Sequence, residues 1–187
     1  LYNIDETNAD QIFEICDTIL SDDPQYQILT EDALWTAYNL IQQYRKYVTQ
    51  EFIDKIDKFY FSNLSEHIIP SLKILHFLIS RDFTPPNSIC KNFISLFFSN
   101  DKQVGKLSLD CLYLILQNQE KDATKNLIKN GFINVLGDLL SSQQFETKLK
   151  AAEVICILIE ECGNELCYLL CHKGYIHGLF DIFEFEK

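Results

Sequence analysis

Length, composition and charge restrict the chain to a globular protein of moderate size. It has 187 residues, of which 47% are hydrophobic and 23% charged, so it can bury a substantial core. No stretch approaches the roughly 18 consecutive apolar residues of a membrane-spanning helix. The net charge of −11 opposes binding to nucleic acid phosphates. The chain contains no Met, and we expect it to be part of a longer protein.

The negative charge is concentrated at the N-terminal end. Nine Asp and Glu residues precede Arg45, the first basic residue, so residues 1–44 carry −9 and the remainder −2. Such a field favours a basic partner, or it serves only to keep the protein in solution. It is also the wrong sign for the basic region of a signal peptide. We therefore expect the seven Cys residues to be free thiols, in a cytoplasmic or nuclear protein.

A long apolar helix recurs four times along the chain. Its nine-residue central segment, numbered here as positions 1 to 9, begins at Ala33, Ser71, Ser108 and Ala151, which are 38, 37 and 43 residues apart. Position 1 is always small, and position 8 is always aliphatic. A small side chain at a fixed helix position allows a neighbouring helix to approach closely, so the pattern predicts a repeated packing unit.

A shorter amphipathic helix precedes each long one. We expect these helices at residues 10–20, 51–61, 88–98 and 132–140, with a fifth at 175–185. Their apolar residues recur at helical spacing, as at Ile133, Leu136 and Leu140. Clusters of Ser, Asn, Asp and Pro separate the helices, and nothing in the sequence has the pattern of a strand.

The C-terminal half adds a third, short helix to each unit. Residues 122–130 precede Gly131 and residues 164–173 precede Gly174, which is typical of a left-handed turn that ends a helix. A three-helix unit of about 40 residues is typical of armadillo repeats, and a two-helix unit of HEAT repeats. The sequence therefore predicts an all-α, right-handed solenoid of about five armadillo/HEAT-like repeats, forming one domain over residues 1–187.

Two stretches resemble the importin-α family. ALWTAYNL at residues 33–40 is similar to that family's third-helix motif A-x-W-x-x-x-N. FETKLKAA at residues 145–152, with Tyr168, Leu169, Gly174 and Ile176 after it, is similar to one of its later repeats. In this register the chain corresponds to about five repeats from the family's middle and C-terminal half. The resemblance implies a transport adaptor that binds basic nuclear localisation signals in a concave groove.

The resemblance also implies which residues bind the peptide. In the family, the motif Trp flanks the Lys or Arg stems of an extended peptide, and the motif Asn binds its main chain. Trp35 and Asn39 match these two positions, one turn apart on one helix face. Packing within the protein is the alternative role for both. The equivalent pairs in the later helices are Lys73 and Phe77, Asp110 and Leu114, and Glu153 and Ile157.

These later pairs give the candidate peptide-binding set a mixed character. Asp110 and Glu153 could receive basic side chains and Lys73 would repel them, but all three could equally be solvated helix charges. The apolar residues at position 7 suit a helix or strand as partner, although we expect them in the core, since middle-layer helices bury much of their surface. Two functions stay open: an importin-α-like adaptor for an extended basic segment, and an armadillo-type scaffold for a helical partner with no transport role.

Other chemistry has little support in the sequence. No nucleophile triad, phosphate-binding loop or H-E-x-x-H motif is present, so we do not expect an enzyme. Cys167 and Cys171 lie one turn apart beside His172, but without a C-x-x-C motif we expect no metal or other cofactor. The basic residues at 121, 125 and 129 suit a solvated face. The apolar end of the chain suggests further repeats or a contact surface, through Phe180, Ile182, Phe183 and Phe185.

Overall fold

The computed structural model describes residues 5–21, 24–81, 83, 96–97, 99, 101–118 and 131–184. These residues form helices and connecting turns with no strand among them, which confirms the all-α prediction. The chain divides into two compact units, Leu1–Phe77 (unit 1) and Leu78–Lys187 (unit 2). No helix within the described ranges is long and apolar enough to cross a membrane.

The described residues of unit 1 form four α-helices and two short 3-10 helices. In chain order they are α1 (Glu6–Ile19), η1 (Pro24–Leu29), α2 (Thr30–Gln43), η2 (Arg45–Tyr47), α3 (Gln50–Asp57) and α4 (Ser65–Ile79), the last of which reaches into unit 2. The Asp5 carboxylate accepts a hydrogen bond from the Thr7 N–H at the start of α1, so this helix begins earlier than predicted. Helix α1 packs on α2, and the Phe13 ring stacks on Tyr47 with centroids 4.3 Å apart.

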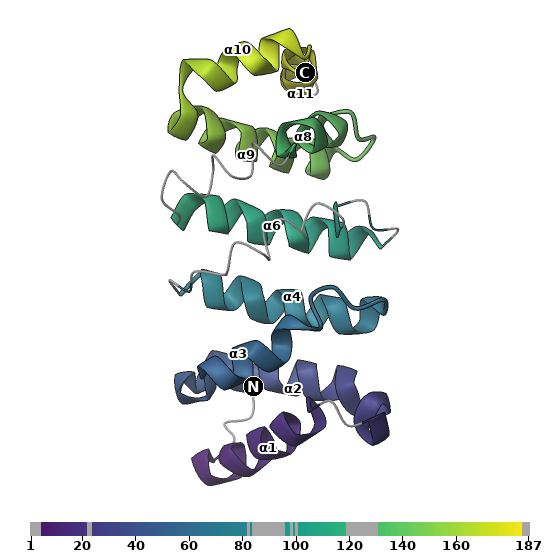
Figure 1. The fold of residues 1–187 in the computed structure, drawn as a ribbon, viewed down its shortest axis with the longest axis vertical. Coiled ribbons are helices and arrows are strands. Elements are labelled where there is room, and N and C mark those ends of the chain that lie inside the picture. Colours follow the sequence, from purple (N-terminus) through teal and green to yellow (C-terminus); the bar gives the residue numbers. More distant parts are fainter. Residues whose placement is uncertain are drawn as a thin grey trace. The chain divides into compact units, whose positions relative to one another are not determined.

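Unit 2 is organised around its longest helix. Its helices are α6 (Lys102–Asn118), α8 (Phe132–Leu140), α9 (Phe145–Cys162), α10 (Asn164–His172) and α11 (Ile176–Glu184). Helix α9 contacts α6, α8, α10 and α11 (Figure 1). The predictions for α8, α10 and α11 are confirmed to within one residue at each end. The helix predicted at 122–130 and almost all of that at 88–98 lie outside the described residues.

The repeated segment is buried in the same way in all four long helices. At positions 1, 5 and 8 every side chain is exposed by 3% or less: Ala33, Ala37, Leu40; Ser71, Leu75, Leu78; Ser108, Leu112, Ile115; Ala151, Ile155, Leu158. The spacing i, i+4, i+7 places them on one helix face. Both buried serines form hydrogen bonds, since Ser71 donates to the Ile68 carbonyl at 2.9 Å and Ser108 to the Val104 carbonyl at 2.8 Å.

Glycines allow the sharp turns and one close approach in unit 2. Gly131 (φ 85°) and Gly174 (φ 77°) have the left-handed conformation that the sequence predicts, which most side chains avoid. In α8, a Cβ added at Gly137 would lie 2.2 Å from the Tyr175 ring. A side chain at position 137 would therefore displace the Tyr175 ring, which belongs to the turn that leads into α11.

Candidate functional site

The eight candidate residues occupy positions 3 and 7 of the four long helices, and none of them is fully buried. Asn39 is exposed and the other seven are half-buried, namely Trp35, Lys73, Phe77, Asp110, Leu114, Glu153 and Ile157. The expectation that Phe77, Leu114 and Ile157 lie in the core is therefore wrong, because positions 1, 5 and 8 already form the buried face. These three side chains lie at the edge of the core.

Position 6 belongs to the same surface and was not recognised in the sequence. It lies three residues after position 3, so positions 3, 6 and 7 form one stripe along each helix, which we call the outer stripe. The four residues at position 6 are Tyr38, His76, Tyr113 and Cys156, of which Cys156 is exposed and the others are half-buried. The i, i+3 spacing of Tyr38 from Trp35 was the available signal.

In unit 1 the outer stripe of α2 binds a lysine from α4. The Trp35 and Tyr38 rings meet edge to face, with centroids 6.1 Å apart. The Lys73 Nζ lies 4.9 Å from the Trp35 centroid and 5.8 Å from the Tyr38 centroid. In the described part of the chain no carboxylate forms an ion pair with Lys73, so its ammonium group is held there by cation–π attraction to the two rings.

Two carboxylates lie one turn before Trp35 on the same helix. Glu31 is half-buried and Asp32 is exposed, and they precede Trp35 by four and three residues. Neither forms an ion pair with any residue that the structure describes. Helix α2 therefore places two carboxylates beside an outer stripe of two aromatic rings and the exposed Asn39 amide, which offers both a donor and an acceptor.

Other acidic residues of the N-terminal segment pair within unit 1. Lys46 Nζ lies 2.9 Å from Glu6 and 2.6 Å from Asp10, and Lys55 Nζ lies 2.6 Å from Asp17. Hydrogen bonds from Lys46 and Tyr47 hold the pKa of Asp10 below its usual value. Burial, together with the hydrogen bond to Asp10, raises the pKa of Tyr47 to about 12. Part of the concentrated negative charge thus stabilises the fold.

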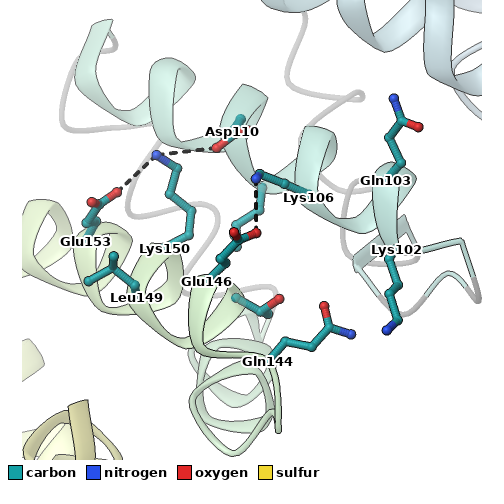
Figure 2. Close-up of a pocket in the computed structure, with 11 residues that line it drawn as sticks. Lys102, Gln103, Lys106, Asp110, Gln144, Glu146, Leu149, Lys150 and Glu153 are labelled. Carbon is teal, nitrogen blue, oxygen red and sulfur yellow. Dashed lines mark hydrogen bonds and ion pairs between the residues drawn. The ribbon is translucent and has the colours of Figure 1, made fainter. Parts of the chain in front are cut away.

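Unit 2 has a groove of about 500 Å³ between α6 and the start of α9 (Figure 2). Its three carboxylates are all paired with lysines. Lys106 Nζ lies 3.1 Å from Glu146, while Lys150 Nζ lies 3.3 Å from Asp110 and 3.0 Å from Glu153. Lys102 also lines the groove and forms no ion pair with the residues described. A basic ligand would find no unpaired carboxylate in this groove.

Lys150 has three partners, one of them aromatic. Its Nζ lies 4.2 Å from the centroid of the Tyr113 ring, in addition to the two carboxylates. We call Asp110, Tyr113 and Glu153 the Lys150 cage. Burial alone would lower the pKa of Lys150, but the hydrogen bond to Glu153 and the negative charges of both carboxylates outweigh it and raise the pKa.

Solved structures of designed proteins have the same fold. No protein-family model and no curated protein matches the chain. A computationally designed armadillo repeat protein for modular peptide recognition matches with a TM-score of 0.69 and 14% identity, over 94% of this chain and 84% of that one. A designed armadillo repeat protein in complex with a (KR)4 peptide has a TM-score of 0.65 and 15% identity, over 96% and 87%. The fold is an armadillo-repeat solenoid.

A third designed armadillo repeat protein matches over 90% of this chain and 72% of its own, with a TM-score of 0.66 and 16% identity. At these identities the likeness concerns the fold alone, and the closeness to importin-α stays a prediction.

The structure describes some of the other residues that the sequence analysis considered for metal binding or surface contact. Among the described residues no group of three or more His, Cys, Asp or Glu is arranged to hold a metal ion. Cys167 is half-buried and Cys171 is exposed. In α11 Phe180 is 62% exposed whereas Ile182 is buried. The side chains of 183 and 185, and the basic residues at 121, 125 and 129, lie outside the described part.

Proposed function

We propose that this chain is a non-enzymatic armadillo-type binding protein. The outer stripe of α2 would hold part of an extended polypeptide segment, with a Lys or Arg of that segment against Trp35. The observation that carries the proposal is the position of Lys73 Nζ, 4.9 Å from the Trp35 centroid. A ring that holds an ammonium group in this geometry is suited to the basic side chain of a partner.

The surroundings of Trp35 support the same ligand. Glu31 and Asp32 supply negative charge within one turn, and they form no ion pair with the described residues. The exposed Asn39 amide is placed to bond to a peptide main chain. The likeness in fold to a designed armadillo protein in complex with (KR)4 adds to this case.

In its finer form the proposal is an importin-α-like adaptor for a nuclear localisation type of segment. It rests on the ALWTAYNL motif and on the α2 stripe. Such an adaptor would work in the cytoplasm and nucleus. Only α2 combines Trp and Asn at positions 3 and 7, so we expect micromolar affinity, with a single anchoring side chain supplying much of it.

A second candidate is a scaffold that binds an amphipathic helix. The observation in its favour is in unit 2, where the position 7 residues of α6 and α9, Leu114 and Ile157, are both apolar and half-buried. Helices commonly bind partners through apolar side chains that are partly exposed in this way. For this candidate, Leu114→Ala would weaken partner binding more than Trp35→Ala.

The test is fluorescence anisotropy with a fluorescein-labelled basic peptide. Trp35→Ala should weaken binding about 2- to 30-fold, the range of a cation–π contact, and Asn39→Ala about fivefold, the value of one hydrogen bond. Tyr168→Ala is the matched control, since that ring is 74% exposed and lies off the stripe. Equal affinity in Trp35→Ala would contradict the proposal, and absence of binding at tens of micromolar with intact helicity would favour the scaffold.

A further inference from the structure

Each unit holds one lysine against the outer stripe of an earlier long helix. In unit 1 Lys73 from α4 lies over Trp35 and Tyr38 of α2. In unit 2 Lys150 from α9 lies over Tyr113 of α6. Tyr38 and Tyr113 both occupy position 6, so the two units use the same ring position to hold a cation of the chain itself.

The two lysines differ in how firmly they are held. Position 3 is Trp35 in α2 but Asp110 in α6, so the second ring of unit 1 is replaced by a carboxylate in unit 2. Lys73 lies against two rings and forms no ion pair in the described part of the chain. Lys150 lies against one ring and two carboxylates, the latter at 3.3 and 3.0 Å.

We propose that the partner segment contributes one basic side chain, which displaces Lys73 from Trp35, and that unit 2 accepts no basic side chain because Lys150 fills the corresponding position. This inference rests on the proposed function and adds the chemistry of the partner. The segment it describes has a single essential Lys or Arg among neutral residues, rather than a continuous basic run.

Displacement of Lys73 requires only that its own side chain move. An arginine guanidinium stacks on an aromatic ring at least as well as an ammonium group and is more weakly hydrated. Lys73 is half-buried, so its flexible side chain can carry the ammonium into solvent when the ring is taken. The cation–π attraction that Lys73 gives up is replaced by that between the ligand and the same ring.

If a ligand displaced Lys150, two partly buried carboxylates would lose their cation. The ligand alone would then have to balance their negative charge. The Asp110 and Glu153 side chains are 26% and 42% exposed, and Lys150 forms an ion pair with both. Lys102 and Lys106, which line the same groove, would repel an approaching basic group. Removal of the Lys150 charge should therefore open a second cation site formed by the Lys150 cage.

The first arm of the test measures competition at Trp35. The probe is a labelled eight-residue peptide with one Arg among Ser and Ala residues. Lys73→Met should bind it about two- to fivefold more tightly than the parent, the value of one exposed cation–π contact. Lys58→Met is the matched control, because Lys58 lies 5.0 Å from the Phe59 centroid and has the same charge. Equal affinities for Lys73→Met and Lys58→Met would overturn the inference.

The second arm counts binding sites by isothermal titration calorimetry with the same peptide. The parent should bind one peptide per chain and Lys150→Met two, with the second site abolished again in Lys150→Met/Asp110→Asn. If circular dichroism shows that Lys150→Met does not fold, Lys150→Gln replaces it in the experiment. A stoichiometry of two in the parent, or of one in both folded Lys150 variants, would overturn the inference.

The outcomes separate this inference from the proposed function. If the parent binds the peptide and Trp35→Ala binds it more weakly, while Lys73→Met shows no gain over its control, the proposed function stands and the inference falls. If neither the parent nor Lys73→Met binds at tens of micromolar, both are contradicted.

Discussion

Units 1 and 2 bury the same positions of their long helices but expose different side chains on the outer stripes. Both bury positions 1, 5 and 8 of their long helices, and both leave positions 3, 6 and 7 partly or fully exposed in the described part of the chain. They differ at position 3, which is Trp35 in α2 and Asp110 in α6. With Trp the held lysine lies on rings alone, and with Asp it also forms ion pairs. Position 3 of α9 adds a second carboxylate, Glu153, whereas position 3 of α4 is Lys73 itself, so the units differ at position 3 of both long helices. The proposed exchange of Lys73 depends on this difference.

The largest expected effect tests the buried face that the units share. Leu40→Ala in unit 1 and Leu158→Ala in unit 2 each remove a position 8 side chain exposed by 1% or less. Each should lower the free energy of unfolding by about 3 kcal/mol, because burial is reduced and a cavity is left. Leu114→Ala, at the half-buried position 7, should lower it by about half as much.

Urea unfolding followed by circular dichroism measures all three variants. If Leu114→Ala destabilised the protein as much as the other two variants, position 7 would belong to the core, and its assignment to the outer stripe would be wrong.

A second effect tests the close approach found in unit 2. Gly137→Ala places a methyl group against the Tyr175 ring and should lower the free energy of unfolding by about 1–3 kcal/mol, the range for overpacking. The measurement is again urea unfolding. In a Tyr175→Ala background, Gly137→Ala should cost only a fraction of the stability that it costs in the parent, because the ring is absent. Independent, additive effects of the two substitutions would show that the ring and the glycine are not in contact.

A smaller effect sharpens the contrast between the two lysines. Lys150→Met should lower the free energy of unfolding by about 1–2 kcal/mol, since two carboxylates lose their shared partner. Lys73→Met should lower it by about 0.5 kcal/mol, the value of a cation–π contact near the surface. Thermal unfolding at low salt compares the two variants with the parent. The reverse order would mean that Lys73, and not Lys150, is the firmly held residue.

The smallest effect concerns pH and unit 1. The pKa of Asp10 is lowered in the fold by Lys46 and Tyr47, so the ionised form is favoured in the native state. Its contribution is present above the ordinary Asp pKa of about 4 and is lost as the pH falls through the lower folded value. The difference in stability between the parent and Asp10→Asn should therefore disappear in acid. A difference that persists unchanged at pH 2 would exclude the ionisation of Asp10 as its cause.

Much of the fold followed from apolar periodicity, and some of it did not. The segment 132–140 was predicted with its observed bounds because a glycine precedes it and a Ser pair follows it. The start of α1 was missed because Asp5 caps the helix, which begins at Glu6, four residues before the predicted start. The 3-10 helices at 24–29 and 45–47 were missed because such short elements have no apolar period.

The candidate site was predictable only within a single helix. Helical spacing placed Trp35 and Asn39 together, and the same rule could have added Tyr38. The approach of Lys73 to Trp35 joins residues from two helices, and spacing within one helix contains no information on the distance between two. Lys73 was therefore expected either to repel a basic partner or to be a solvated helix charge, and its contact with the Trp35 ring could not be foreseen.

The most direct test of the central claim is the emission of Trp35, the only Trp in the chain, during titration with the single-Arg peptide. The account predicts a saturable change in emission, with the dissociation constant found by anisotropy and with no change for the peptide in which Ala replaces Arg. Binding seen by anisotropy without any change in Trp35 emission would contradict it, because the peptide would then bind elsewhere on the chain.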